Sequence, residues 1–282
     1  MVDCAFLFYN KKIIKIMARK KHLQGIESQD MDYINEKMGY NVVDRCDEII
    51  HFARSVDYKI DIKCKNKKQK EFLKLLKNED KQICLGIGAA GSGKSYISLA
   101  YALEALKDPS TPYKRIICFV PTCEAGAMSI GFLKGTLEEK IEPYLEADTY
   151  TMMKILDKSG NYSTRQIIDN LIKSKIINYE LVNFARGKTI DDAIILLNES
   201  ENYSKEEMLL LLTRIGENSK IVISGDLQQL DRKDIKRKEK ECGLKYVMEK
   251  LSSLDEYGII EFTNEDIVRN PLITKILDIW NK

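Results

Sequence analysis

The sequence predicts an α/β fold in which helices flank a parallel sheet. Short apolar runs without polar alternation recur along the chain, helical patterns separate them, and a glycine-rich turn joins one run directly to a helix. Uninterrupted apolar runs are typical of strands buried on both faces, and strands that alternate with helices indicate a parallel sheet. The predicted strands are Ile83 to Ile87, Ile116 to Val120, Ala193 to Leu197, Ile221 to Ser224 and Ile259 to Phe262.

Helical patterns separate these runs, and another precedes them. Lys94 to Lys107 stops just before a proline, and Ser204 to Arg214 opens with the helix-start signature Ser-Lys-Glu-Glu. The pattern from Ser28 to about Lys77 is also helical and predicts a small N-terminal lead-in. We therefore expect an N-terminal extension with its lead-in over residues 1–60, followed by one α/β domain over residues 61–282.

The stretch from Pro121 to about Tyr162 is predicted to be irregular, because glycines and Pro143 interrupt it. It follows a predicted strand, and long insertions at the carboxyl edge of a parallel sheet usually carry function. Phe132 and Tyr144 lie in this stretch, and aromatic side chains of this kind can stack on the bases of single-stranded nucleic acids. Packing within the protein explains both residues equally well.

Composition places the chain among globular proteins with an ordinary charge balance. Of 282 residues, 44% are hydrophobic and 31% are charged, and 45 Lys and Arg nearly cancel 43 Asp and Glu to leave a net charge of +2. This balance favours neither a nucleic-acid nor a membrane partner for the chain as a whole. No run approaches the roughly 18 apolar residues of a membrane span. The cysteines form no CxxC pair, which fits reduced thiols, so we expect a cytoplasmic protein.

The strongest motif is G-x-x-x-x-G-K-[ST], which occurs once, between an apolar strand pattern and a helical pattern. This is the context of the loop that binds the phosphates of ATP, because its glycines let N–H groups turn inward and the following helix adds its positive N-terminal dipole. Lys94 is expected to reach the β- and γ-phosphates, and Ser95 is expected to bind Mg²⁺. The expected ATP contacts are Gly88, Ala89, Ala90, Gly91, Ser92, Gly93, Lys94, Ser95 and Tyr96.

A second element, Asn198-Glu199, ends the predicted strand Ala193 to Leu197. Such proteins usually carry Asp-Glu here, and the aspartate holds a Mg²⁺-bound water with a full negative charge. Asn198 offers an amide oxygen without that charge, so we expect weaker Mg²⁺ binding unless Glu199 or Asp192 compensates. Glu199 is the candidate that orients and polarises the attacking water. The alternative is that Asn198 and Glu199 only cap the following turn.

A third element begins at Ser224, where another buried strand meets a loop. At the carboxyl edge of the sheet, Asp226 and Gln229 would face the γ-phosphate, and Gln229 would report hydrolysis across the cleft. An ordinary polar turn is the alternative.

Asn66 and Gln69, upstream of the phosphate loop, have two interpretations. The segment resembles the base-reading element of helicase-like ATPases, in which a glutamine grips the adenine edge through its amide. Asn at a helix N-cap with Gln three residues later is also a capping box, and a helix follows directly. Both interpretations can hold at once.

Taken together and in this order, these elements resemble the PhoH-like family of ATPases, single-core RecA-like relatives of the superfamily 1 helicases. The resemblance runs from about Asn66 to Trp280. It implies ATP binding and hydrolysis and, less directly, RNA or single-stranded DNA as a partner, and the compact length resembles the phage-encoded type, which would act in the host cytoplasm. Family members usually carry Asp where Asn198 stands and Gln where Glu201 stands. Further matching segments are Val120-Pro121, Glu124 to Gly126, Ile130 to Gly135, Glu139-Lys140, Pro143 to Leu145, Ala185 to Thr189, Thr213 to Gly216, Ser219-Lys220 and Asp266 to Pro271.

Phosphoryl transfer benefits from an arginine that meets the charge on the γ-phosphate. Arg269 is the first candidate, Arg214 the second, and Arg186 a third, although each is equally well explained as a surface ion pair. After Asp231 only about fifty residues remain, too few for the second core that flanks ATP in ordinary helicases. We therefore expect head-to-tail assembly into a homo-oligomeric ring, with a hexamer as the leading case, in which one subunit supplies Arg269 to its neighbour.

Two basic clusters are candidate contacts for a phosphate backbone, although solvated helix faces explain them as well. The leading function is thus an ATPase motor or switch that acts on RNA or single-stranded DNA. A small-molecule kinase and a nucleotide-regulated binding protein with little turnover remain alternatives, because a phosphate loop alone does not identify the acceptor. The clusters are Lys63, Lys65, Lys67, Lys68 and Lys70, and Arg232, Lys233, Lys236, Arg237, Lys238 and Lys240.

Overall fold

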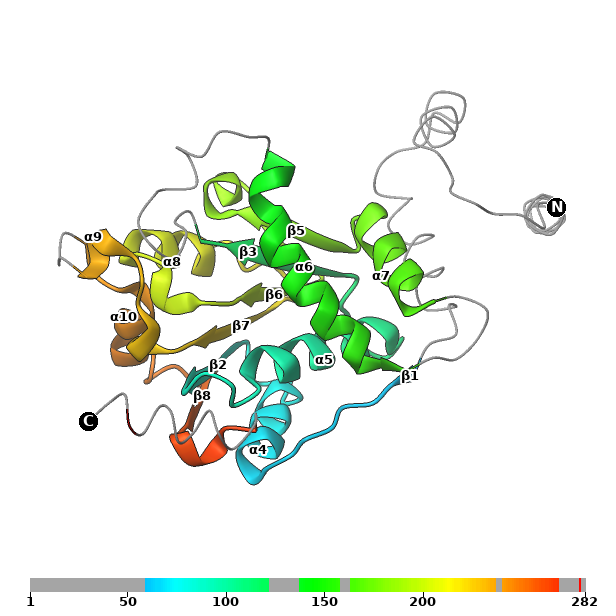
Figure 1. Ribbon diagram of the computed structural model, residues 1–282. Coiled ribbons are helices and arrows are strands. Elements are labelled where there is room, and N and C mark those ends of the chain that lie inside the picture. The colour runs from blue at the N-terminus through cyan, green and yellow to red at the C-terminus, as the bar shows by residue number, and fades with distance from the viewer. Residues whose placement is uncertain (1–58, 122–136, 158–162, 237–239, 269–278, 280–282) are drawn as a thin grey trace, which may run out of the picture. The chain divides into compact units, whose positions relative to one another are not determined.

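The computed structural model describes residues 59–121, 137–157, 163–236, 240–268 and Ile279 (Figure 1). The strands are β1 (Lys59–Ile60), β2 (Ile83–Gly88), β3 (Arg115–Val120), β4 (Leu156–Asp157), β5 (Ile177–Leu181), β6 (Ala193–Leu197), β7 (Lys220–Gly225) and β8 (Tyr257–Phe262). The α-helices are α4 (Lys67–Leu76), α5 (Lys94–Lys107), α6 (Leu137–Ile155), α7 (Thr164–Lys173), α8 (Lys205–Leu212), α9 (Lys233–Lys236) and α10 (Gly243–Lys250). Short 3₁₀ turns are η2 (Val182–Ala185), η3 (Ser200–Asn202), η4 (Leu227–Gln229) and η5 (Asn264–Asp266).

Six of these strands form one parallel sheet in the order β5-β3-β6-β7-β2-β8. All five predicted strands are present, and β6 has the predicted bounds. The α/β fold class is therefore confirmed. The sheet also contains β5, which the sequence analysis missed because its residues Ile-Asn-Tyr-Glu-Leu mix polar and apolar types, as an edge strand allows.

Alternate residues of the central strands enter two separate hydrophobic cores, which explains their uninterrupted apolar character. Ile116 and Cys118 belong to the first core, together with side chains of α4, α5, α6 and α7. Ile117 and Phe119 belong to the second core, which η2, α8 and α10 cover. Figure 1 shows α5 and α6 crossing the face of the sheet that bears the first core. The sheet is thus covered on both faces, as predicted for a parallel sheet.

The prediction of an irregular stretch after β3 was wrong for much of its length. It contains α6, a helix of 19 residues with Pro143 inside it. The helix buries Met152 and Ile155 in the first core, and this packing outweighs the proline signal. Residues 122–136 and 158–162, where the glycines lie, fall outside the described ranges.

The helix starts agree with local capping chemistry. Ser204 caps α8, and its reciprocal pair with Glu207 confirms the helix start that the sequence indicated. Asn66 caps α4, which is the described end of the predicted N-terminal helical region. The extension that precedes residue 59 lies outside the described part of the chain. Within the described residues, no helix combines the length and the apolar character needed to cross a bilayer.

Candidate nucleotide-binding site

The carboxyl edge of the sheet brings the three predicted elements of the site together. The phosphate loop follows β2, Asn198-Glu199 follows β6, and Asp226 follows β7. Because β7 lies between β6 and β2, the Asp226 segment stands between the other two. A buried hydrogen bond joins the segments that follow β6 and β7, with the Glu201 Oε2 atom accepting from the Asp226 N–H at 2.9 Å. Ligands of open parallel α/β sheets bind at this edge.

The phosphate loop has the backbone conformation that its glycines were expected to provide. Gly88, Gly91 and Gly93 have φ angles of 125°, 79° and 90°, in the region that side chains rarely adopt. A Cβ atom on Gly88 would lie 1.9 Å from the carbonyl oxygen of Phe262, so the loop also needs glycine to pass β8. The loop leads straight into α5, whose N-terminal N–H groups attract anions. These residues fit a phosphate group.

Lys94 lies inside this loop, with only 8% of its surface exposed. Its Nζ donates to the carbonyl oxygens of Gly88 at 2.6 Å and Ala89 at 2.9 Å. Ser95 is exposed in the first turn of α5, where its hydroxyl can reach a metal beside the phosphates. The Tyr96 side chain packs against the first core and its hydroxyl donates to the Asp61 carbonyl, so only the Tyr96 backbone N–H can serve a nucleotide.

Asn198 and Glu199, the predicted metal-binding residues, follow β6 directly, and Glu199 has a left-handed φ of 50°. Although solvent reaches Glu199, the protein around its carboxyl group raises its pKa, and the charge of Asp231 adds to this effect. Asp192 lies at the opposite end of the strand, bound to Lys114 at 3.3 Å. Five strand residues span roughly 16 Å, so Asp192 cannot compensate for Asn198, and that expectation was wrong.

Glu201 is a feature of the site to which the sequence analysis gave no role. It is buried, with 5% of its surface exposed, and its carboxylate holds the Asp226 N–H. Burial raises the pKa of Glu201 to about 7, the hydrogen bond from Asp226 opposes this rise, and the charges of Glu199 and Asp226 add to it. The only sequence signal was the departure from the Gln usual in the PhoH-like family, which does not reveal where the side chain points.

Asp226 and Gln229 form a small hydrogen-bonded unit at the same edge. The Asp226 Oδ2 atom accepts from the Gln229 Nε2 at 2.6 Å, and Oδ1 accepts from the Gln228 N–H at 3.0 Å. Asp226 is buried, whereas Gln229 is exposed. The turn that was offered as an alternative is therefore present, and it stands beside the phosphate loop.

Asn66 and Gln69 contact the phosphate loop from the start of α4. The Asn66 Oδ1 atom caps the helix by accepting from the Gln69 N–H at 2.8 Å. The reciprocal half of the predicted capping box is replaced, because the Gln69 Oε1 atom accepts from the Lys65 N–H at 2.7 Å. The Gln69 Nε2 atom donates to the Ser92 carbonyl at 2.7 Å, and the side chain is only 2% exposed. Adenine reading by Gln69 therefore stays a prediction, while its contact with the loop is direct.

Arg214 lies at the amino edge of the sheet rather than beside the phosphate loop of its own chain. Its guanidinium donates to the carbonyl oxygens of Leu210 at 3.2 Å and Lys188 at 3.1 Å, which closes the end of α8. Arg186 is exposed after η2, and Arg269 falls outside the described ranges. Within one chain, the structure therefore does not bring Arg214 to the nucleotide site.

Two residues of the second basic cluster form ion pairs within the protein. Arg232 is 4% exposed and bound to Glu207 and Asp234, and Lys240 pairs with Asp234 at 3.4 Å. Arg232 is therefore not a surface contact for a nucleic acid. Tyr144 is half-buried on α6. The predicted residues Phe132, Arg237 and Lys238 lie outside the described ranges, as do the side chains of Lys233 and Lys236.

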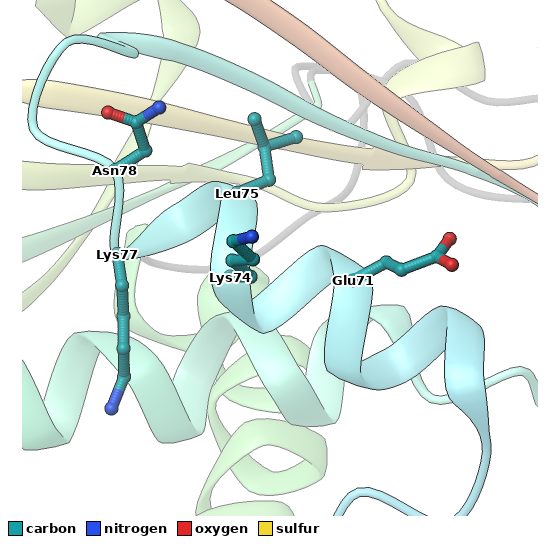
Figure 2. Close-up of a pocket in the computed structure, with 5 residues that line it drawn as sticks. All are labelled: Glu71, Lys74, Leu75, Lys77 and Asn78. Atoms are coloured by element: carbon teal, nitrogen blue, oxygen red, sulfur yellow. The ribbon is translucent and has the colours of Figure 1, made fainter.

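A separate hollow lies at the other end of α4, away from the site. It has a volume of about 530 Å³, and Figure 2 shows its lining side chains on α4 and on the turn that follows. The lining residues are Glu71, Lys74, Leu75, Lys77 and Asn78. None of them belongs to the three elements that meet at the carboxyl edge.

A glycine-built phosphate loop between a buried strand and a helix, at the carboxyl edge of a parallel sheet, defines the class of P-loop nucleoside triphosphatases. Within that class the chain belongs to the PhoH family, whose PhoH-like protein model matches residues 61–281. Membership of the PhoH family, drawn from the sequence, is thus confirmed, while the phage-encoded type and the relation to superfamily 1 helicases stay predictions.

Several bacterial relatives match most of this chain. A PhoH-like protein of Bacillus subtilis is 35% identical over 222 residues, which cover 78% of this chain and 64% of the relative. A PhoH-like protein of Mycobacterium tuberculosis is 36% identical over 198 residues, covering 70% and 52%. Protein PhoH of Escherichia coli is 31% identical over 237 residues, covering 83% and 62%. The aligned part of this chain thus spans only about half to two thirds of these relatives.

Proposed function

We propose that this chain binds ATP together with Mg²⁺ and hydrolyses it at the carboxyl edge of the sheet. The observation that carries the proposal is the phosphate loop itself, with its left-handed glycines and with Lys94 held inside it. Loop N–H groups would bind the phosphates, and Lys94 would exchange its carbonyl partners for β- and γ-phosphate oxygens. Ser95, with Asn198 and Glu199, would hold Mg²⁺, whose charge would offset that of the phosphates.

Glu199 is the group that we assign to the attacking water. Glu199 follows β6, which lies next to β7 in the sheet, and it is exposed at the carboxyl edge. The pKa of Glu199 is raised toward neutral pH, and a general base works best when its pKa lies near the pH of the reaction. Asp226 and Gln229, joined by their hydrogen bond, would line the γ-phosphate side, so that loss of this phosphate alters the segment after β7.

Phosphate release from Mg²⁺-ATP by the unmodified chain and by Lys94→Ala tests this proposal. We expect Lys94→Ala to lower release by about 100-fold or more, because the lysine neutralises the transferred phosphoryl group. Lys173→Ala, an exposed change at the end of α7, is the matched control and should leave release unchanged. Equal release by Lys94→Ala and the unmodified chain would refute the site.

We further propose that hydrolysis is coupled to RNA or single-stranded DNA. Support comes from the basic start of α4, where Lys67 is 90% exposed although it lies 3.8 Å from Glu71. Stimulation of phosphate release by single-stranded RNA or DNA, lost as salt rises, would support the coupling. Tight ATP binding without phosphate release would instead identify a nucleotide-regulated binding protein, which the missing charge at Asn198 favours.

We also propose that the chain works as a ring in the cytoplasm, with Arg269 acting on the site of a neighbouring subunit. The described residues contain one parallel core, and the Arg214 guanidinium is bound at the opposite edge of the sheet. Mixing two variants of strongly reduced activity, Lys94→Ala and Arg269→Ala, tests shared sites directly. Restored phosphate release on mixing would support action in trans, whereas a monomer with the same activity per subunit at every concentration would refute the ring.

A further inference from the structure

The outward-facing carbonyl groups of the phosphate loop bind two segments that are distant in sequence. The Gly91 carbonyl accepts from the Val268 N–H at 3.1 Å, and the Ser92 carbonyl accepts from the Gln69 Nε2 at 2.7 Å. Gly93 lies between the same two side chains, because a Cβ atom there would stand 2.5 Å from the Gln69 Nε2 and 3.8 Å from the Val268 Cγ2. The loop is therefore held from both the start of α4 and the segment that follows β8.

A third hydrogen bond joins these two segments to each other. The Asn66 Nδ2 atom donates to the Asp266 carbonyl at 2.9 Å, while the Asn66 Oδ1 atom caps α4 by accepting from the Gln69 N–H. Asp266 is itself fixed, since its Oδ2 atom accepts from the Thr263 N–H at 2.9 Å. One asparagine amide thus serves two purposes, because its oxygen completes a helix and its nitrogen holds the segment after β8.

This arrangement links the loop to the chain beyond it. A phosphate is bound by loop N–H groups, and each N–H belongs to the same rigid peptide plane as a carbonyl of the preceding residue. Any turn of the Gly91 or Ser92 peptide planes on phosphate binding therefore moves the carbonyls that Val268 and Gln69 hold. The loop and the segment from Asp266 to Val268 must respond together.

We propose that Asn66 is a positioning residue that keeps the segment Asp266 to Val268 in contact with the phosphate loop, so that nucleotide at the loop sets the position of this segment. The segment leads directly to Arg269. The proposal rests on the proposed function, because a nucleotide must bind at the loop. Asn66 need not touch the nucleotide, and its effect is transmitted through the Asp266 carbonyl.

Two substitutions separate the two purposes of Asn66. Asn66→Asp and Asn66→Ser both keep an oxygen that caps α4, and both lose the donor to the Asp266 carbonyl. Because only the first adds a negative charge, agreement between them excludes a charge effect. Asn170→Asp, on the exposed side of α7, is the control for an added charge elsewhere.

Amide hydrogen exchange of residues 263–268 tests the proposal without any need for hydrolysis. In the unmodified chain, Mg²⁺-ATP should slow exchange of the Val268 amide. In Asn66→Asp and Asn66→Ser we expect exchange about tenfold faster, with no slowing by ATP and with α4 amides unchanged. Exchange at Val268 equal to that of the unmodified chain, with and without ATP, would overturn the proposal. Asn170→Asp should behave as the unmodified chain.

A double-mutant cycle on phosphate release adds a second test. We expect Asn66→Ser to lower kcat about tenfold while KM stays within about twofold, and to have no further effect in an Arg269→Ala chain. Independent effects that multiply would overturn the proposal, because Asn66 would then act separately from the segment. If the unmodified chain released no phosphate, the proposed hydrolysis would fail, and hydrogen exchange would still decide the role of Asn66.

Discussion

Lys94 and Lys220 are buried lysines with matching contacts at opposite edges of the sheet. Lys94, 8% exposed, donates to two carbonyls of the phosphate loop, and Lys220, 2% exposed, donates to the carbonyls of Leu76 at 2.6 Å and Asn78 at 2.8 Å. The partners of Lys220 belong to the end of α4 and the turn after it, which no ligand needs to displace. Lys94 binds carbonyls of the loop whose residues fit a phosphate.

The pKa values of carboxyl groups also differ between the two edges. At the amino edge, hydrogen bonds from Asn218 and Lys114 lower the pKa of Asp192, although burial alone would raise it. At the carboxyl edge, the protein around Glu199 raises its pKa although solvent reaches it, and burial raises the pKa of Glu201. The charged form of Asp192 is therefore stabilised at the amino edge, whereas the pKa values of Glu199 and Glu201 are raised at the carboxyl edge, as is typical of functional sites.

Among changes to the carboxyl groups, the largest expected effect is that of Glu199→Gln, which removes the proposed base while keeping the size of the side chain. We expect kcat for phosphate release to fall by about 100-fold or more, because the amide cannot accept a proton from water. ATP binding, measured by equilibrium titration without divalent ions, should remain within about threefold, because Glu199 is assigned to Mg²⁺ and water rather than to the nucleotide. Unchanged phosphate release would show that Glu199 is not the base.

Glu201→Gln probes the cost of charge at the carboxyl edge through pH. A carboxyl group whose pKa is raised on folding binds more protons in the folded state, so stability falls as pH rises from about 4.5 to about 7. Glu201→Gln keeps an oxygen for the Asp226 N–H and should remove this fall, with a gain of about 3 kcal/mol at pH 8. Urea unfolding at a series of pH values, without divalent ions, measures this pH dependence of the free energy of unfolding. A pH profile identical to that of the unmodified chain would contradict the assignment.

Asn198→Asp should have the smallest effect and should sharpen the contrast further. It adds a formal charge beside the proposed metal site, so Mg²⁺ should bind more tightly by about threefold to tenfold, with equal or faster turnover. Titration of phosphate release against Mg²⁺ at fixed ATP measures this shift. Slower turnover at unchanged Mg²⁺ affinity would show that Asn198 does not stand near the metal.

Local sequence patterns were sufficient to predict the loops and strands that position the candidate site. The phosphate loop and the strand from Ala193 to Leu197 were predicted because their information lies in consecutive residues and in the buried character of parallel strands. The helix α8 was predicted for the same reason, since Ser204 and Glu207 form the capping box at its start.

The remaining features depend on contacts between distant segments. No local pattern shows that the amide of Gln69 meets Ser92, that Arg214 closes α8, or that Glu201 holds the Asp226 N–H. Edge strand β5 lacks a clear pattern because its partly exposed side chains need not be apolar. The position of Asp192 was available from sequence order, since it precedes β6, and parallel strands place its start far from the phosphate loop.

The most direct measurement compares Lys94→Met with Lys220→Met in two assays, urea unfolding and phosphate release. Lys94→Met should abolish phosphate release while changing the free energy of unfolding by less than about 1 kcal/mol, because the loop carbonyls are half-buried and water can replace the lysine. Lys220→Met should cost about 2 to 3 kcal/mol, because two carbonyls at the end of α4 lose their donor, and should leave kcat within about twofold. Equal stability losses in both variants, with phosphate release retained by Lys94→Met, would contradict the division between the two edges.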